Sequence, residues 1–263
     1  NTNDLTLQVD NVHYADAGLI TLWSRVSAKY AAMRAATVSA APYIVAIGVP
    51  SIGSSAQGTS PGVPVHQAND ILVFCYAGNG NTAVTTPTNG GVTWAHVTGS
   101  PQHDAGAGAN ARVTAWWTRA TGPGTTAPTT ADVSGDGGKL ATIIVIRGCR
   151  TTGDPFVDGD GATAVTSTSV SFPANDTTGT NNCLIVNILA ATYNAASLAQ
   201  GSAWANASLA DLNQDIDQFS TTSSAGLVVL SGVKTTGGVV SATTMTLANT
   251  ATQALLSVAF APP

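Results

Sequence analysis

The chain has 263 residues, a formal net charge of −5 and a charged fraction of only 9%, against about 25% in an average soluble domain. It contains no glutamate and few lysines, so it lacks the residues that usually solvate helix surfaces, whereas its many Thr and Val residues favour strands. Nine scattered basic residues do not suit a nucleic-acid backbone or an anionic membrane, and no apolar run approaches the roughly 20 residues that cross a bilayer.

Residues 1–42 carry a helical pattern that the rest of the chain lacks. Apolar residues recur at the spacing of one helix face after a possible Asp16 N-cap, which predicts an amphipathic helix over about residues 17–36. The stripe consists of Leu19, Leu22, Trp23, Val26, Tyr30 and Met33. Two interpretations stay open: a helix that covers one end of its own domain, or an assembly arm that docks on a neighbouring subunit. The first residues lack the basic and apolar regions of a secretion signal, so we expect none.

From residue 43 onward the pattern is one of strands separated by turns rich in Gly, Pro, Asn and Thr. The expected strands are 43–48, 70–78, 92–98, 111–119, 139–147, 182–193, 203–213, 225–234, 239–247 and 253–261. No helical signal lies between them and no linker divides them. The sequence therefore predicts an all-β fold, with one antiparallel, jelly-roll-like β-sandwich domain over 43–263 that follows the N-terminal helical arm over 1–42.

Two tryptophans are candidates for contact with a glycan. Trp116 and Trp117 are adjacent in an alternating strand, so their side chains must point to opposite faces, one into the core and the other outward. Trp204 lies in a later expected strand. Packing in a core or an interface is one interpretation of these side chains, and sugar stacking on Trp116 and Trp204 is the other.

The densest acidic segment, 154–161, contains Asp154, Asp158 and Asp160. Oxygen-rich loops of this kind can hold Ca²⁺, but no glutamate closes the segment as in an EF-hand. We therefore expect a turn-rich loop, with these three aspartates as the calcium candidates. A glycosidase generally needs two paired carboxylates, whereas most aspartates of this chain stand in turn contexts.

The remaining reactive residues lack the spacing of a catalytic or cofactor site. Cys75, Cys149 and Cys183 form no CxxC pair and are expected to be small buried side chains. The four histidines have no His or Cys partner at metal-ligand spacing, and no Gly-x-Ser-x-Gly elbow or phosphate-binding loop occurs. We therefore expect no cofactor, no resident metal and no enzymatic activity.

Five segments together resemble a group of tailed-bacteriophage virion proteins of β-sandwich type. They are DILVFCYAGN (70–79), VTTPTNGGVTW (84–94), VTAWWTRATG (113–122), IVIRGCRTTGDP (144–155) and SAWANASL (202–209). Proteins of this group are head decorations, head fibres and tail-associated adhesins, and the resemblance covers roughly residues 60–261. It implies a location in the virion after synthesis in the host cytoplasm, and it assigns no active-site residue.

We therefore expect a non-enzymatic virion structural protein that decorates the capsid or forms part of a fibre or tail. Its expected partners are other virion proteins and copies of itself, bound through the N-terminal arm and a neutral sandwich face, with no nucleic acid and no membrane. One alternative is a carbohydrate-binding adhesin module that contacts a glycan of the host surface. A sandwich-fold polysaccharide hydrolase is a further alternative, which would require two aspartates about 5–10 Å apart on one concave face.

Overall fold

The computed structural model describes residues 41–54, 58–80, 83–88, 91–103, 110–130, 137–192, 200–220 and 224–263. They belong to one unit of the chain, Ala40–Pro263. The prediction of an all-β protein is confirmed, because the described residues form antiparallel strands and no helix. It follows that none of them forms a helix able to cross a membrane. The predicted helix over 17–36, with its stripe from Leu19 to Met33, lies outside the described residues.

The strands vary from two-residue pairs to long, continuous elements. They are β1 Tyr43–Ile47, β2 Ser51–Ser54, β3 Ile71–Asn79, β4 Ala95–His96, β5 Gln102–His103, β6 Ala111–Arg119, β7 Gly138–Arg147, β8 Phe156–Ser171, β9 Asn175–Asp176, β10 Cys183–Thr192, β11 Gly201–Ala205, β12 Ala210–Phe219, β13 Gly226–Lys234, β14 Val239–Val240 and β15 Thr244–Phe260.

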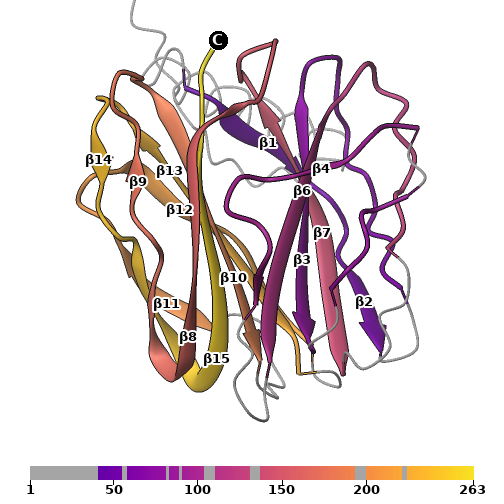
Figure 1. Ribbon diagram of the computed structural model, residues 1–263, viewed down its shortest axis with the longest axis vertical. Helices are drawn as coiled ribbons and strands as arrows, with labels where there is room; N and C mark the ends of the chain where they lie inside the picture. The colour runs from indigo at the N-terminus through magenta and orange to yellow at the C-terminus, as the bar shows by residue number, and fades with distance from the viewer. Residues whose placement is uncertain are drawn as a thin grey trace, which may run out of the picture. The chain divides into compact units, whose positions relative to one another are not determined.

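Two antiparallel sheets pack face to face in a β-sandwich-like arrangement (Figure 1). The first has the order β1-β7-β3-β6-β4, with β2 also paired to β7 and β5 to β6. The second has the order β11-β15-β10-β13-β12, with β8 also paired to β15, and β9 and β14 form a separate ribbon. The central strands β3, β7 and β10 are buried along nearly their whole length, which explains why they read as continuous apolar runs rather than alternating ones.

Aromatic rings mark where the two sheets meet. Trp117 of β6 contacts Phe156 of β8 edge to face at 5.4 Å between ring centroids, and Phe156 contacts Phe260 of β15 at 5.2 Å. Val73 and Ile144 are register partners that share the Trp117 face of the first sheet. Register partners lie side by side on one face, so this side of the sheet is the inner side of the sandwich.

The outer face of the first sheet is covered by the chain's own connecting segments, visible to the right of β3 and β7 in Figure 1. Val63, Val84, Val92 and Trp94 from these segments pack with Leu72, Phe74, Tyr76 and Trp116 of the sheet. The segments also bond one another, for example through the hydroxyls of Thr59 and Thr130 at 2.8 Å. The sheet is thus buried on both faces.

The second sheet also has an outer cluster, in which Phe172, Phe219, Met245 and Leu247 pack over Leu189, Val228 and Leu255. A buried polar chain runs beside it. Asn175 donates to the hydroxyl of Ser257 at 2.5 Å, Ser257 donates to the Asn187 amide oxygen at 2.7 Å, and Asn187 donates to Thr243 at 3.2 Å. These bonds tie the β9–β14 side to the sheet, although the Asn175 amide oxygen is buried without a hydrogen-bond partner among the described residues.

Several predicted strands have other bounds in the structure, and the strand predicted over 92–98 is only the two-residue β4. The predicted strands 239–247 and 253–261 are largely one element, β15, because register shifts between Thr246 and Gln253 absorb the polar residues that separated them in the sequence. The single predicted strand 203–213 is divided into β11 and β12 by a turn, in which the Asn206 side chain accepts a bond from the Ser208 N–H at 2.8 Å.

Candidate functional site

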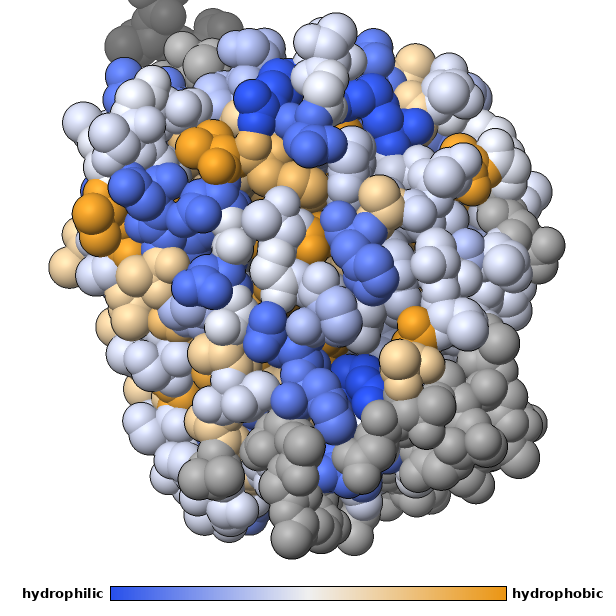
Figure 2. Space-filling view, viewed as in Figure 1, coloured by the Kyte–Doolittle hydropathy of each residue, from blue (hydrophilic) through white to orange (hydrophobic). Residues whose placement is uncertain are grey.

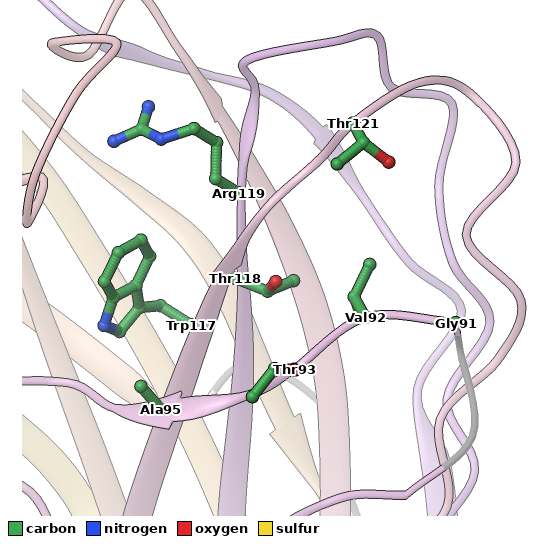
Figure 3. A pocket seen from close by; sticks show the side chains of 8 residues that line it. All are labelled: Gly91, Val92, Thr93, Ala95, Trp117, Thr118, Arg119 and Thr121. Carbon is green, nitrogen blue, oxygen red and sulfur yellow. The ribbon is translucent and has the colours of Figure 1, made fainter.

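A groove opens along the edge of β6 where β4 leaves the first sheet; we call it the β6 groove. Its volume is about 750 Å³. It is lined by Gly91, Val92, Thr93, Ala95, Trp117, Thr118, Arg119 and Thr121. In Figure 3, Trp117 and Arg119 project from one side of β6 and Thr118 from the other, while the segment from Gly91 to Ala95 crosses below them.

The groove exists because β4 is only two residues long. Ala95 and His96 pair with Trp117 and Trp116, and the described segment before Ala95 then diverges from β6. On the β3 side of β6, the Ala120 N–H donates to the Asp70 carbonyl at 2.9 Å, and the Ala120 carbonyl accepts from the Asn69 N–H at 2.8 Å. Backbone groups alternate in direction along an antiparallel strand, so the N–H and carbonyl of Arg119 point to the groove.

The Arg119 side chain is held in place at the end of this groove. Its Nη1 donates to the Arg150 carbonyl at 2.7 Å and its Nη2 donates to the Gly153 carbonyl at 3.0 Å. Partial burial lowers the pKa of the Arg119 guanidinium, but arginine remains protonated at neutral pH. No carboxylate lines the groove among the described residues, so Arg119 makes this wall locally positive. The lining also lacks the carboxylate pair that a glycosidase requires.

Of the two adjacent tryptophans, only Trp116 was a candidate for glycan contact, and the structure buries it. Trp116 is completely buried, with its ring 5.6 Å from Phe74 and 5.4 Å from His96, so the prediction that it contacts a glycan is wrong. The segments that cover the outer face of the sheet enclose it, and sequence alternation cannot show such a cover. Trp117, on the inner side at the sheet edge, is only partly buried and lines the groove.

Trp204 is 37% exposed on β11, surrounded in the chain by exposed small residues. Its exposure agrees with a surface role, but the β6 groove does not include it. The structure therefore does not bring Trp116 and Trp204 together on one platform, and the prediction of glycan contact by Trp204 stays a prediction.

The aspartates of segment 154–161 do not form the expected loop, because β8 begins at Phe156 and includes Asp158 and Asp160. A Cβ atom on Gly159 would lie 2.6 Å from the Thr98 carbonyl oxygen, and one on Gly161 would collide with the Gln102 side chain. The glycines thus allow the 98–102 segment to pack closely on β8. Asp and Gly are both uncommon in strands, so the sequence favoured a loop here, and the strand depends on pairing with β15.

The carboxylates of this segment are occupied by backbone donors. Asp158 accepts from the Asp176 N–H at 2.6 Å and Asp160 accepts from the Gly161 N–H at 2.7 Å, while Asp154 is exposed before the strand. Within the described part of the chain, no three His, Cys or Asp side chains are grouped so that they could hold a metal ion. The calcium candidates therefore do not converge on one site.

The three cysteines are free and buried, which confirms the predicted burial. Burial raises the pKa of the thiols of Cys75 and Cys149 to about 12 and that of Cys183 to about 11. In the native protein at pH 8 they should therefore react with a thiol reagent far more slowly than in denaturant, measured by the colour change of an aromatic disulfide. A thiol that reacts equally fast in both states would contradict this burial.

The same pKa values give a pH dependence of stability. Folding raises these pKa values above the ordinary 9.0, so the unfolded chain loses its thiol protons first. The stabilisation is complete below pH 9 and is lost as the pH rises toward 12. We expect urea unfolding curves to show a steeper fall in stability between pH 9 and 11 for the wild type than for a variant with all three cysteines changed to alanine.

The lysines and arginines of the described residues are Arg112, Arg119, Lys139, Arg147, Arg150 and Lys234, and none of them is exposed. Arg147 pairs with Asp70, and Arg150 donates to the Phe156 carbonyl. The surface in Figure 2 is accordingly pale over most of this face, with hydrophilic and apolar residues in small scattered groups. The described surface does not offer the clustered cations that a phosphate backbone requires.

Comparison of the chain with protein-family models, with curated proteins and with solved structures finds no match in any of the three.

Proposed function

We propose that this chain is a non-enzymatic structural protein of a tailed-phage particle, a jelly-roll-like sandwich attached to the capsid, a fibre or the tail. The resemblance of five segments to phage virion proteins suggests the particle. The observation that carries the assembly role is an apolar edge on the described surface. The N-terminal segment, with its amphipathic stripe, serves as the attachment arm.

Exposed large apolar side chains gather at the free edge of the first sheet; we call this region the β1–β2 edge. Eight such side chains are exposed among the described residues. Five of them lie within ten residues of chain, and they are Tyr43, Val45, Ile47, Val49 and Ile52. A sixth, Val65, follows Gly62, whose N–H donates to the Val49 carbonyl at 3.2 Å. Single exposed apolar residues are common in proteins, but five on one edge, with a sixth in the segment bonded to that edge, are characteristic of a contact surface.

This edge has no electrostatic protection against association. Residues 35–69 contain no Asp, Glu, Lys or Arg, so no charge stands on either β1 or β2. Natural edge strands are commonly shielded by charged side chains, by proline or by a bulge. Here strand addition is limited by a bulge at Val45 and, after β1, by Pro50. Both features leave the apolar side chains exposed. We infer that another virion polypeptide or a second copy covers this edge in the particle.

In this proposal the sheet faces contribute less to assembly than was expected from the sequence. A broad neutral sandwich face was the expected contact, but the outer faces of both sheets carry buried clusters formed with the chain's own segments. The remaining strand surface belongs to the partly exposed β8, β11 and β12, and it is not neutral, because β8 and β12 carry Asp158, Asp160, Asp211, Asp215 and Asp217. In the proposal, the β1–β2 edge therefore takes the role that the neutral face was given.

Incorporation into particles tests this proposal. Val49 and Val65 are 76% and 88% exposed, so Val49→Asp with Val65→Asp should leave folding intact while placing two charges on the edge. In hosts infected by the phage that encodes this chain, we expect the double variant to be depleted at least tenfold from gradient-purified particles, as measured by mass spectrometry. Val239→Asp, at a 67% exposed position on β14, is the matched control and should be incorporated normally.

The arm is tested separately by removing residues 1–39, which keeps the buried Pro42 before β1. The truncated chain should melt cooperatively and fail to enter particles. Normal incorporation of the truncated chain would refute the arm, and normal incorporation of the charged double variant would refute the edge. Absence of the wild-type chain from particles would refute the proposal as a whole.

A further inference from the structure

The β6 groove combines three features that recognise sugars: an aromatic wall, hydrogen-bonding groups in its lining and one fixed cation. None of them is needed for the proposed attachment to a particle. The aromatic wall and the cation are held by contacts with other parts of the sandwich, so these two features are organised before any ligand arrives.

The aromatic wall is Trp117. Its ring is fixed by the edge-to-face contact with Phe156, which in turn packs against Phe260 in the core between the sheets. An aromatic side chain that is partly exposed and held in one orientation offers a flat surface to the apolar face of a pyranose ring at little cost in conformational entropy.

The polar groups come from both sides of the groove. The Arg119 N–H and carbonyl point into it from the floor, and the exposed Thr93 and Thr121 are part of the lining. Thr118 also lines it, but its side chain is buried on the side of β6 opposite to Trp117 (Figure 3). Hydroxyl groups both donate and accept hydrogen bonds, as do the hydroxyls of a sugar. An extended peptide fits less well, because the segment from Gly91 to Ala95 crosses the groove and leaves only a short length of β6 unpaired.

The positive charge of Arg119 indicates that the ligand carries a negative charge. Arg119 has five N–H donors, and the carbonyls of Arg150 and Gly153 occupy two of its nitrogens, which leaves donors for a ligand and fixes the guanidinium plane. With no carboxylate among the described lining residues, a neutral ligand would leave this cation without an anionic partner. A carboxylate is the sugar substituent that matches the geometry of a guanidinium.

We propose that the β6 groove binds a saccharide that carries a carboxylate, with the sugar ring against Trp117 and the acidic group directed to Arg119. The site is distinct from both the β1–β2 edge and Trp204. If the groove binds no saccharide, the proposal of a particle protein still stands, because glycan binding and incorporation into particles are measured independently.

The test uses the full chain on a glycan array with matched pairs of oligosaccharides that differ by one sugar, either neutral or carboxylated. Titration calorimetry with the tightest binder follows. We expect the carboxylated member of at least one pair to bind at least tenfold more tightly. Trp117→Ala and Ala95→Leu should each weaken binding at least tenfold. Ala95 is exposed, so Ala95→Leu fills the groove without changing the core and remains informative if Trp117→Ala impairs folding.

Two further variants separate the groove from the rest of the surface. Arg119→Gln should remove the preference for the carboxylated member of a pair, and Trp204→Ala, a matched tryptophan outside the groove, should bind as the wild type does. The proposal is overturned if no glycan binds, if neutral and carboxylated members bind equally, if Ala95→Leu binds normally, or if Trp204→Ala loses binding.

Discussion

Replacing Trp116 with alanine is expected to lower the free energy of unfolding by about 3–5 kcal/mol, the range for truncating a fully buried large aromatic residue. Trp116 has no exposed surface, and it packs edge to face with Phe74 at 5.6 Å between centroids under the covering segments. Alanine would leave a cavity between the first sheet and this cover, which the β6 backbone cannot close because it is bonded to β3 along its whole length. Urea unfolding followed by tryptophan fluorescence and circular dichroism measures the change.

Two further variants make this prediction specific. The Trp116 indole N–H finds no acceptor among the described residues, so Trp116→Phe removes an unsatisfied donor and should cost no more than about 1.5 kcal/mol. Trp204→Ala removes a partly exposed ring and should change stability by about 0.5 kcal/mol or less. Equal losses for Trp116→Ala and Trp204→Ala would show that Trp116 is not a core residue.

The result also bears on how glycan binding is tested. A loss of binding in Trp116→Ala would report damage to the sandwich rather than a lost contact, because the ring lies beneath the covering segments. The informative tryptophan is Trp117, whose ring reaches the β6 groove. Melting temperatures must therefore be recorded for each tryptophan variant before its binding is interpreted.

The second large effect is expected from Arg147→Met, which should cost about 3–5 kcal/mol because it leaves the Asp70 carboxylate buried without a cation. Asp70 has a side chain that is 2% exposed, and Arg147 clamps it with Nε to Oδ1 at 2.9 Å and Nη2 to Oδ2 at 2.7 Å. The side-chain bond to Asp70 raises the pKa of Arg147. This pair fixes the start of β3 to the end of β7, and Asp70 also accepts from the Gln67 N–H at 2.9 Å.

A double-mutant cycle checks that the loss of stability comes from the buried, unpaired carboxylate of Asp70. Adding Asp70→Asn to Arg147→Met should recover part of the lost stability, because a neutral amide costs less to bury than an unpaired carboxylate. Asp176→Asn is the control, since Asp176 is an exposed aspartate whose carboxylate accepts bonds from its neighbour Thr178. Additive losses in the cycle would contradict the pairing as the source of stability.

The sequence by itself determined the fold class and the central strands. The strands expected at 70–78, 111–119, 139–147, 182–193 and 225–234 correspond to β3, β6, β7, β10 and β13. Their apolar runs are long, and both sides of these strands are buried, so local pattern and tertiary environment agree. The burial of Cys75 and Cys183 follows from the same apolar runs, whereas that of Cys149, which lies after β7, was predicted because free cysteines are commonly buried.

Edge and covering elements could not be predicted in the same way. β8 is 16 residues long, yet its Asp, Gly, Thr and Ser composition indicated loops. It forms a strand because it pairs with β15 and because the 98–102 segment packs over its glycines. Strand propensity depends on such neighbours rather than on the backbone alone.

The candidate site shows the same division between local and distant causes. Alternation correctly placed Trp116 and Trp117 on opposite faces, but only the tertiary structure decided which one is accessible, since segments from 58–70 and 83–101 cover one face of the first sheet. The β6 groove depends on where a two-residue strand stops pairing, and the β1–β2 edge on which strand ends the sheet. Both are set by long-range contacts, whereas the periodicity of a sequence records only which residues share a face.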